Sequence, residues 1–88
     1  MAFRCDPTKA ALNIKKHGVS FSDAEGVFYD PLAIHLPDPD AEGEERFVAL
    51  GLGSAGELLV VVYTLCDDEI RLISARRATR KEIRNYES

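Results

Sequence analysis

Residues 57–75, ELLVVVYTLCDDEIRLISA, contain two extended apolar segments separated by a short polar turn. The segment from Glu57 to Thr64 is so uniformly apolar that we expect a central strand covered on both faces. Cys66-Asp67-Asp68 forms the turn, and Glu69 to Ala75 alternates as a half-buried strand does. The stretch therefore predicts a β-hairpin at the centre of a sheet. Its second strand is expected to place Ile70, Leu72 and Ser74 on one face and Arg71, Ile73 and Ala75 on the other.

Two more strands are predicted before this hairpin. Leu32 to Leu36 alternates apolar and other side chains, and Arg46 to Leu52 is again extended in pattern. Pro37 and the acidic residues through Glu45 form the loop between them, and Gly53 to Gly56 forms a tight turn. Four strands joined by short turns are typical of an antiparallel sheet.

Three helices are predicted around the strands. Asp6-Pro7 is a helix start, because Asp accepts from free amides and Pro suits the first helical position. This helix is expected to end at about His17, before Gly18. Its expected apolar stripe is Ala11, Leu12 and Ile14, with Lys9, Asn13, Lys16 and His17 off the stripe.

Two capping boxes mark the other helices. Ser22-Asp23-Ala24-Glu25 begins a short helix that ends near Tyr29, and Thr79-Arg80-Lys81-Glu82 begins a last helix that ends at about Glu87. The whole pattern predicts an α+β fold: an antiparallel four-stranded sheet with two N-terminal helices and one C-terminal helix.

Length and composition restrict the class of protein. The 88 residues suit one domain, 1–88, without a linker. Cys5 and Cys66 lie far apart and lack the spacing of a zinc site. The N-terminus does not resemble a secretion signal, and the apolar run Leu58 to Tyr63 is about a third of a membrane span. We therefore expect a soluble cytoplasmic protein with no metal and no cofactor.

The charges are segregated along the chain. The net charge is −4, but residues 1–20 carry four basic residues against one acid, a net of +3. Residues 21–70 carry one arginine against twelve acids, a net of −11, and residues 71–88 carry six basic residues against two acids, a net of +4. If the two basic ends meet in the fold, they form a cationic patch for phosphates. The alternative is that both are ordinary solvated helix faces.

The residue types suit a reaction that needs no cofactor. Cleavage of RNA by its own 2′-hydroxyl requires a base, an acid and cations around the phosphate. His17, with Lys16 beside it, is the best acid/base candidate, since histidine exchanges protons near neutral pH. The alternative is that His17 only bonds the last carbonyls of its helix. His35 is expected to be an ordinary surface histidine.

Arginines supply the candidate phosphate contacts. Arg76 and Arg77 precede the N-terminus of the last helix, where free amides also favour anions. The alternative is that one of them pairs with an acid such as Glu87. Arg46 is either neutralised locally or carried on its strand into the same site. Tyr63 and Tyr86 could stack on bases, although packing roles are the simpler interpretation.

Taken together, several blocks resemble a known family. They are Asp6-Pro7-x-Lys9, Asn13-Ile14-x-Lys16-His17-Gly18-Val19-x-Phe21, Asp30-Pro31-Leu32, Glu45-Arg46, and Arg71-x-Ile73-Ser74-Ala75-Arg76-x-Ala78-Thr79-x-x-Glu82-x-x-x-Tyr86-Glu87. This set resembles the BrnT family of type II toxins over about Phe3 to Glu87. One departure is Cys5, where many relatives carry Trp.

The resemblance implies a ribonuclease toxin with a RelE-like fold. It also implies a BrnA-like ribbon-helix-helix antitoxin, contact with DNA only through that antitoxin, and a heterotetramer as one assembly. Its functional positions correspond to Lys16, His17, Glu45, Arg46, Arg76 and Arg77 in this chain, with Lys9 and Arg80 as further RNA contacts.

The working hypothesis is metal-independent RNA cleavage with His17 as general acid or base. Lys16, Arg46 and Arg76 would hold the scissile phosphate, and Arg77 would steer the RNA backbone. The alternative is a non-enzymatic module, or co-repressor, that acts through a DNA-binding antitoxin. The hypothesis requires that the basic ends of the chain fold against each other.

Overall fold

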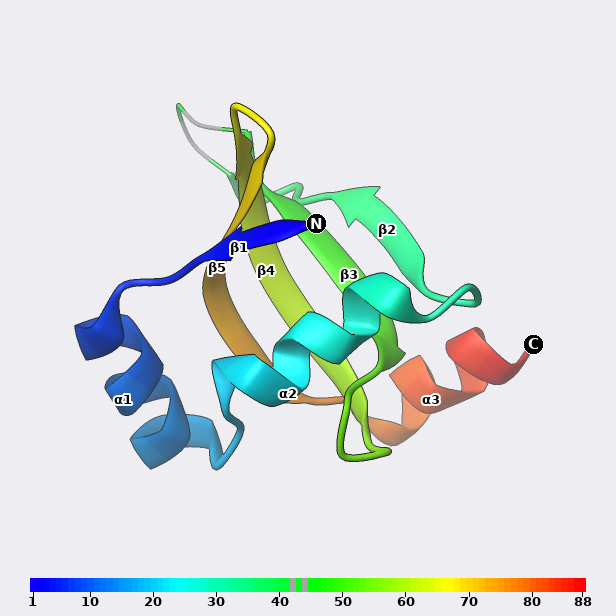
Figure 1. Ribbon diagram of the computed structural model, residues 1–88. Helices are drawn as coiled ribbons and strands as arrows, with labels where there is room; N and C mark the ends of the chain where they lie inside the picture. The colour runs from blue at the N-terminus through cyan, green and yellow to red at the C-terminus, as the bar shows by residue number, and fades with distance from the viewer. Residues whose placement is uncertain (42, 44) are drawn as a thin grey trace.

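The computed structural model describes residues 1–41, 43 and 45–88 of the chain, so Glu42 and Glu44 of the predicted acidic loop lie outside the described residues. Figure 1 shows a curved sheet with helices at its edge and on both sides. The strands are β1 (Ala2–Arg4), β2 (Ile34–Pro37), β3 (Phe47–Leu52), β4 (Leu58–Cys66) and β5 (Glu69–Arg77). The helices are α1 (Pro7–His17), α2 (Phe21–Glu25), the 3-10 helix η1 (Gly26–Tyr29) and α3 (Arg80–Glu87).

The sheet has five strands in the order β1-β5-β4-β3-β2, with β4 at its centre as predicted. Strands β2 to β5 pair antiparallel, whereas β1 pairs parallel with β5. The prediction of a four-stranded antiparallel sheet is therefore wrong, and the sheet is mixed. The missed strand has only three residues, too few for an alternating pattern, and it is held because Phe3 packs against the hydrophobic core.

The predicted pair of N-terminal helices is also wrong in its arrangement. A strand precedes them, and the second helix is a single α-helical turn that continues as the 3-10 helix η1. Its N-cap is Ser20, which accepts from the Asp23 amide, and not the predicted Ser22. Burial of Phe21, Ala24 and Val27 sets the phase of this segment, so packing overrides the local capping pattern.

Helix α1 has the predicted bounds and caps, but the predicted stripe is wrong. Asp6 accepts from the Thr8 amide, and Gly18 ends the helix in the left-handed conformation at φ 70°. Leu12 and Ile14 are 58% and 52% exposed, whereas Asn13 is 6% exposed. The helix therefore lies against the sheet through a polar residue.

Asn13 explains this orientation of α1. Its side chain donates to the Ala75 carbonyl at 2.8 Å and accepts from the Ala75 amide at 3.0 Å. Strand β1 covers β5 only as far as Arg71, so the backbone at Ala75 has no strand neighbour on this side. Because unpaired buried backbone groups are costly, the Asn13 amide takes the place of the missing strand.

A β-bulge decides which residues of β5 face the core. Val62 pairs with Ser74, and Tyr63 pairs with Leu72, so Ile73 is the extra residue. The bulge puts Ala75 on the same face as Leu72, and the predicted placement of Ala75 on the opposite face is wrong. The same shift puts Arg76 on the same face as Arg71, and Arg77 on the opposite face.

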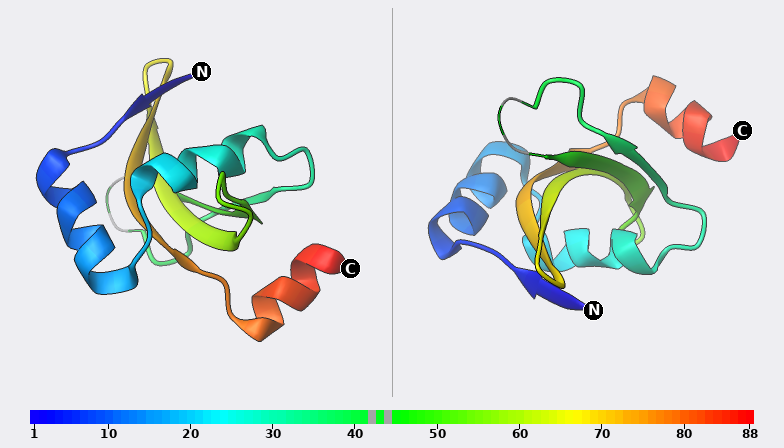
Figure 2. Two further views of the ribbon diagram at one scale, coloured as in Figure 1. Left: turned by 60° about the horizontal axis from the view of Figure 1, so that its bottom comes forward. Right: turned by 90° about the horizontal axis from the view of Figure 1, so that it is seen from above.

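The two faces of the sheet differ in their covering. The core face carries Ala49, Val61, Leu72 and Ala75, and it is covered by α2 and η1. The opposite side, called the open face here, carries Val48, Val60 and Val62. Figure 2 shows α3 on the open-face side, where it contacts β3. No helix in the described part of the chain is long and apolar enough to cross a membrane.

Candidate nucleic-acid interface

Arginines form a row across the open face. Arg4 on β1 pairs with Arg71 on β5, and Arg71 pairs with Thr64 on β4. Arg46 directly precedes β3 and lies at the level of Thr64. Directly paired residues in a sheet point to the same face, so Arg4 and Arg71 lie on one side of the molecule. Arg46 is outside the paired residues, but it is next to Phe47, which packs on the core, so by alternation it is directed to the same side. Arg4 is partly neutralised by an ion pair with Glu69 at 3.1 Å.

Arg76 lies on the same face, farther along β5. It pairs with Val60, four residues from Thr64 along β4, which is about 13 Å at the usual strand rise. Its guanidinium donates to the two carboxylate oxygens of Glu82 at 2.8 and 2.9 Å and to the Arg77 carbonyl at 3.2 Å. Three of the five guanidinium N–H groups are thereby used, which leaves two for a ligand.

The ion pair between Arg76 and Glu82 favours the charged form of both side chains. The hydrogen bond to Arg76 lowers the pKa of Glu82 to about 2, and the same bond raises the pKa of Arg76. Glu82 is therefore ionised at neutral pH and a poor proton acceptor there. It acts by fixing the direction of the guanidinium.

Arg77 points to the other face. Its Nε donates to Glu57 at 2.6 Å, and its Nη1 donates to the His17 carbonyl at 3.0 Å. The end of α1 and the end of β5 thus meet, as the hypothesis required, but the observed bond uses the His17 backbone. Arg76 and Arg77 do not form one clamp, because their side chains lie on opposite faces; each pairs with an acid, as the alternative stated.

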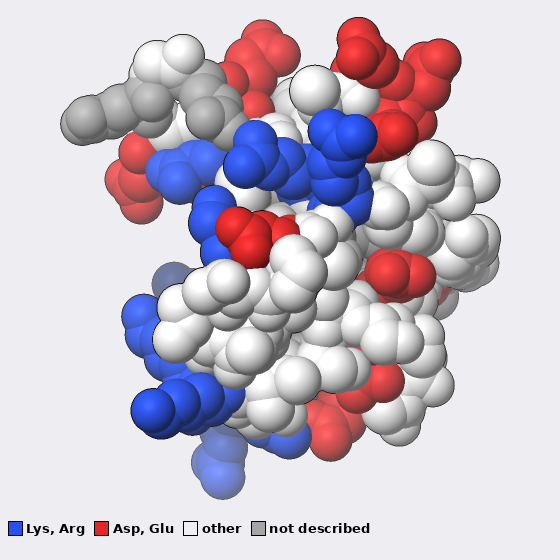
Figure 3. Space-filling model, turned by 60° about the vertical axis from the view of Figure 1, so that its left-hand side comes forward, with Lys and Arg blue, Asp and Glu red and all other residues white. Residues whose placement is uncertain are grey.

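His17 is half-buried and follows Ala10 and Asn13 on the side of α1 that lies against β5. It therefore stands beside the β5 edge of the sheet, where its carbonyl accepts from Arg77. Lys9 and Lys16 on α1 and Arg80 at the start of α3 are exposed. Figure 3 shows Lys and Arg side chains gathered along one side of this view, with acidic side chains beside the upper group.

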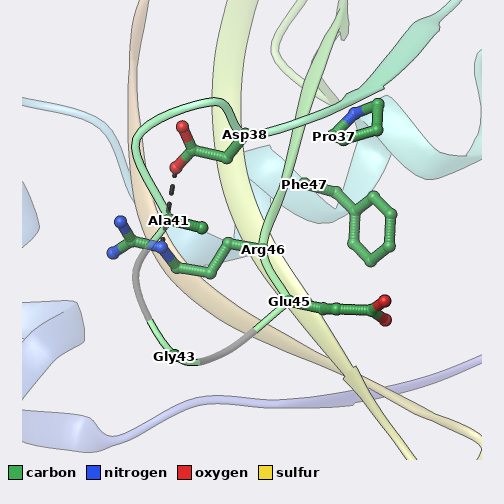
Figure 4. A pocket seen from close by; sticks show the side chains of 7 residues that line it. All are labelled: Pro37, Asp38, Ala41, Gly43, Glu45, Arg46 and Phe47. Atoms are coloured by element: carbon green, nitrogen blue, oxygen red, sulfur yellow. Dashed lines mark ion pairs between the residues drawn. The ribbon is translucent and has the colours of Figure 1, made fainter.

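Arg46 and Glu45 lie at the other end of the strands from His17. Arg46 forms an ion pair with Asp38 at 3.5 Å and donates to the Asp40 carbonyl at 3.4 Å, so local neutralisation is part of its role. Figure 4 shows Glu45 extending away from Arg46. The structure thus groups Arg46 with Arg71, and not with His17. The pocket beside Arg46 and Glu45 is lined by Pro37, Asp38, Ala41, Gly43, Glu45, Arg46 and Phe47.

The aromatic candidates have packing roles. Tyr63 is buried, which raises its pKa, and its hydroxyl lies 2.9 Å from Nδ1 of the exposed His35. Tyr86 donates to Asp30 at 2.6 Å and so ties α3 to the loop before β2. The hydrogen bond to Asp30 raises the pKa of Tyr86. The hydroxyls of both tyrosines are thus engaged within the protein.

The sequence interpretation missed two residues of this face, Arg4 and Arg71. Arg71 could have been found, since it alternates with the apolar Ile70 and Leu72. Arg4 had no signal, because its strand was not predicted. Among the described residues, no group of three or more His, Cys, Asp or Glu side chains is placed to hold a metal ion. Both cysteines are free and exposed.

An α+β domain with four arginines on one open sheet face, three of them paired with acids, has the features of a domain that could bind a polyanion. Comparison with known proteins identifies the family. The family described as "Ribonuclease toxin, BrnT, of type II toxin-antitoxin system" matches residues 5–82. The chain belongs to this BrnT family of ribonuclease toxins.

A solved structure agrees with this assignment. The crystal structure of the Brucella abortus ribonuclease toxin BrnT superimposes with a TM-score of 0.70 at 25% sequence identity. The match covers 91% of this chain and 99% of that chain. No curated protein sequence matches. The predicted family is therefore confirmed, and the predicted fold is confirmed at the level of an α+β domain like BrnT.

Proposed function

We propose that this protein is a metal-independent endoribonuclease that binds RNA across the open face of its sheet. The observation that carries the proposal is that Arg71 and Arg76 lie on one side of the sheet by strand register, with Arg46 directed to the same side by its position before the core-facing Phe47. Cations spread over about 13 Å along β4 suit successive phosphates of a single strand. Apolar side chains between them provide a floor on which bases can lie.

The proposed reaction is attack of a 2′-hydroxyl on the adjacent phosphate. Arg76 is the best-oriented cation for the developing charge, because Glu82 fixes its direction and two N–H groups remain for the phosphate. His17 at the neighbouring sheet edge is the proposed general acid or base, with Lys16 beside it. A base removes the 2′-hydroxyl proton, and an acid protonates the departing 5′-oxygen.

The other candidate residues are assigned to the path of the RNA. Arg46 and Arg71 would hold the chain at the far end of the face, and Glu45 would orient it there. Lys9, Arg77 and Arg80 would contact the backbone along the sheet edge; for Arg77 this requires release from Glu57. These assignments rest on charge and position.

The direct test is RNA cleavage by the purified protein in the presence of a chelator. Wild type is expected to cleave, and His17→Gln is expected to lose about 100-fold, the usual contribution of a general acid or base. Arg71→Gln is expected to weaken binding without changing the fold, because Arg71 is exposed. Arg84→Gln, exposed on α3, is the matched charge control. Full activity of the His17 and Arg71 variants would overturn the proposal.

We further propose a BrnA-like ribbon-helix-helix antitoxin as the partner, a cytoplasmic location and DNA contact through the antitoxin alone. Membership of a type II toxin family supports an antitoxin partner. Light scattering of the co-expressed pair tests the assembly: a mass of two copies of each chain is expected, and a 1:1 complex would contradict the heterotetramer.

A further inference from the structure

A second feature of the open face is a pocket between the sheet and α3. Its volume is about 280 Å³, and its floor is made of aliphatic side chains from β2, β3 and β4, with polar groups only on the α3 side. Figure 2 shows α3 crossing this end of the sheet. The lining residues are Ile34, Leu36, Val48, Leu50, Val60, Glu82 and Asn85.

This pocket is continuous with the arginine that the proposed function places at the phosphate. Val60 lines the pocket and is the strand partner of Arg76. Glu82 also lines the pocket and holds the Arg76 guanidinium. A nucleotide whose phosphate contacts Arg76 therefore has its base within reach of the pocket.

We propose that the pocket binds one nucleobase of the RNA substrate and that Asn85 recognises its edge. The inference rests on the proposed function, since Arg76 supplies the phosphate site. The apolar floor suits the face of a flat ring, and an exposed amide at the rim offers one donor and one acceptor. No side-chain hydrogen bond occupies the Asn85 amide within the described part of the chain.

The polar groups favour adenine. An Asn side chain can accept from the adenine amino group and donate to N7, which is the usual pairing of these two groups. Glu82 adds a permanent negative charge at the rim, and its Oε2 accepts one hydrogen bond while Oε1 accepts two. A carboxylate attracts an exocyclic amine and repels a carbonyl oxygen. Uracil, which presents carbonyls, is the expected poorest base.

The test compares RNAs that differ at one position next to the cleaved bond. Wild type is expected to prefer adenine over uracil by at least fivefold in kcat/KM. Asn85→Ala, which removes both hydrogen-bonding groups without adding a charge, is expected to lose most of this preference. Glu87→Gln, on the same helix and exposed, is the matched control. Cleavage by Asn85→Ala with the wild-type preference would overturn the inference and leave the proposed function intact.

A binding measurement tests base recognition by the pocket without relying on catalysis. With 2′-O-methyl oligonucleotides, which cannot react, the adenine-containing oligonucleotide is expected to shift the NMR signals of Val48, Leu50 and Asn85. Leu36→Trp, at a 60% exposed position, is expected to fill the pocket and abolish these shifts. If Leu36→Trp leaves RNA binding unchanged and instead prevents assembly with a partner protein, the pocket is a protein-docking site and the inference is wrong.

Discussion

Replacement of Glu82 by Gln removes one charge from the contact that orients Arg76. The variant keeps an acceptor oxygen for the Thr79 amide, so the capping box of α3 can remain while the ion pair is lost. The native carboxylate bonds Arg76 through both oxygens at 2.8 and 2.9 Å. The substitution therefore isolates the charge on this carboxylate.

The expected loss of stability follows from the pKa of Glu82. Folding lowers this pKa from 4.5 to about 2, and one pKa unit corresponds to about 1.4 kcal/mol, so the upper limit is about 3 kcal/mol. The Arg76 side chain is 42% exposed, and solvent screening reduces such pairs severalfold. We expect a loss of about 1 kcal/mol at pH 7, or roughly 4–8 °C in Tm.

Urea and thermal unfolding followed by circular dichroism measure this effect. Because the pKa is lowered in the folded state, the contribution is fully present above pH 4.5 and is lost as the pH falls toward 2. The difference between wild type and Glu82→Gln should shrink over that interval. Glu87→Gln should unfold almost as wild type does. A Glu82→Gln variant as stable as wild type at pH 7, or a difference that persists unchanged at pH 2, would refute the reasoning.

Three further substitutions test the packing that supports the site, all by denaturant unfolding. Asn13→Ala leaves the backbone groups of Ala75 unpaired and should cost about 2–4 kcal/mol; wild-type stability would mean that α1 is not needed to cover the strand edge. Gly26→Ala would place a Cβ 2.4 Å from the Ser54 amide nitrogen, so expression of a wild-type-like fold would contradict the described contact. Leu72→Ala, at a fully buried position, should cost about 2–5 kcal/mol, and a loss below 1 kcal/mol would contradict its place in the core.

Strong local signals predicted the elements correctly. Asp6-Pro7 and Gly18 set the ends of α1, and Thr79 with Glu82 forms the expected capping box of α3. The apolar run after Glu57 is the central strand. At each of these helix ends the deciding interaction joins residues at most four positions apart, so it can be predicted from the local sequence.

The errors arise where a long-range contact decides the structure. Phe3 holds a three-residue strand by packing on the core, and Asn13 turns α1 toward an uncovered strand edge. Neither effect appears in the local pattern. The sequence also gives no signal of the bulge at Ile73, yet the bulge moves Ala75 to the core face.

The candidate site was affected by the same bulge. The basic ends of the chain meet, because Arg77 binds the His17 carbonyl, but alternation along β5 puts Arg76 and Arg77 on opposite faces. The bulge decides that Arg76, and not Arg77, shares the open face with Arg71. A single extra residue in a strand reverses the facing of everything that follows. Charge counting could therefore identify the segments that meet but could not sort their side chains by face.

RNA is proposed to lie on the open face of the sheet. Amide and guanidinium NMR signals recorded during titration with a non-cleavable 2′-O-methyl RNA test it most directly. Shifts are expected at Arg46, Val62, Arg71 and Arg76, with little change in α2. Shifts confined to α2 and η1, with the four open-face residues unmoved, would contradict it.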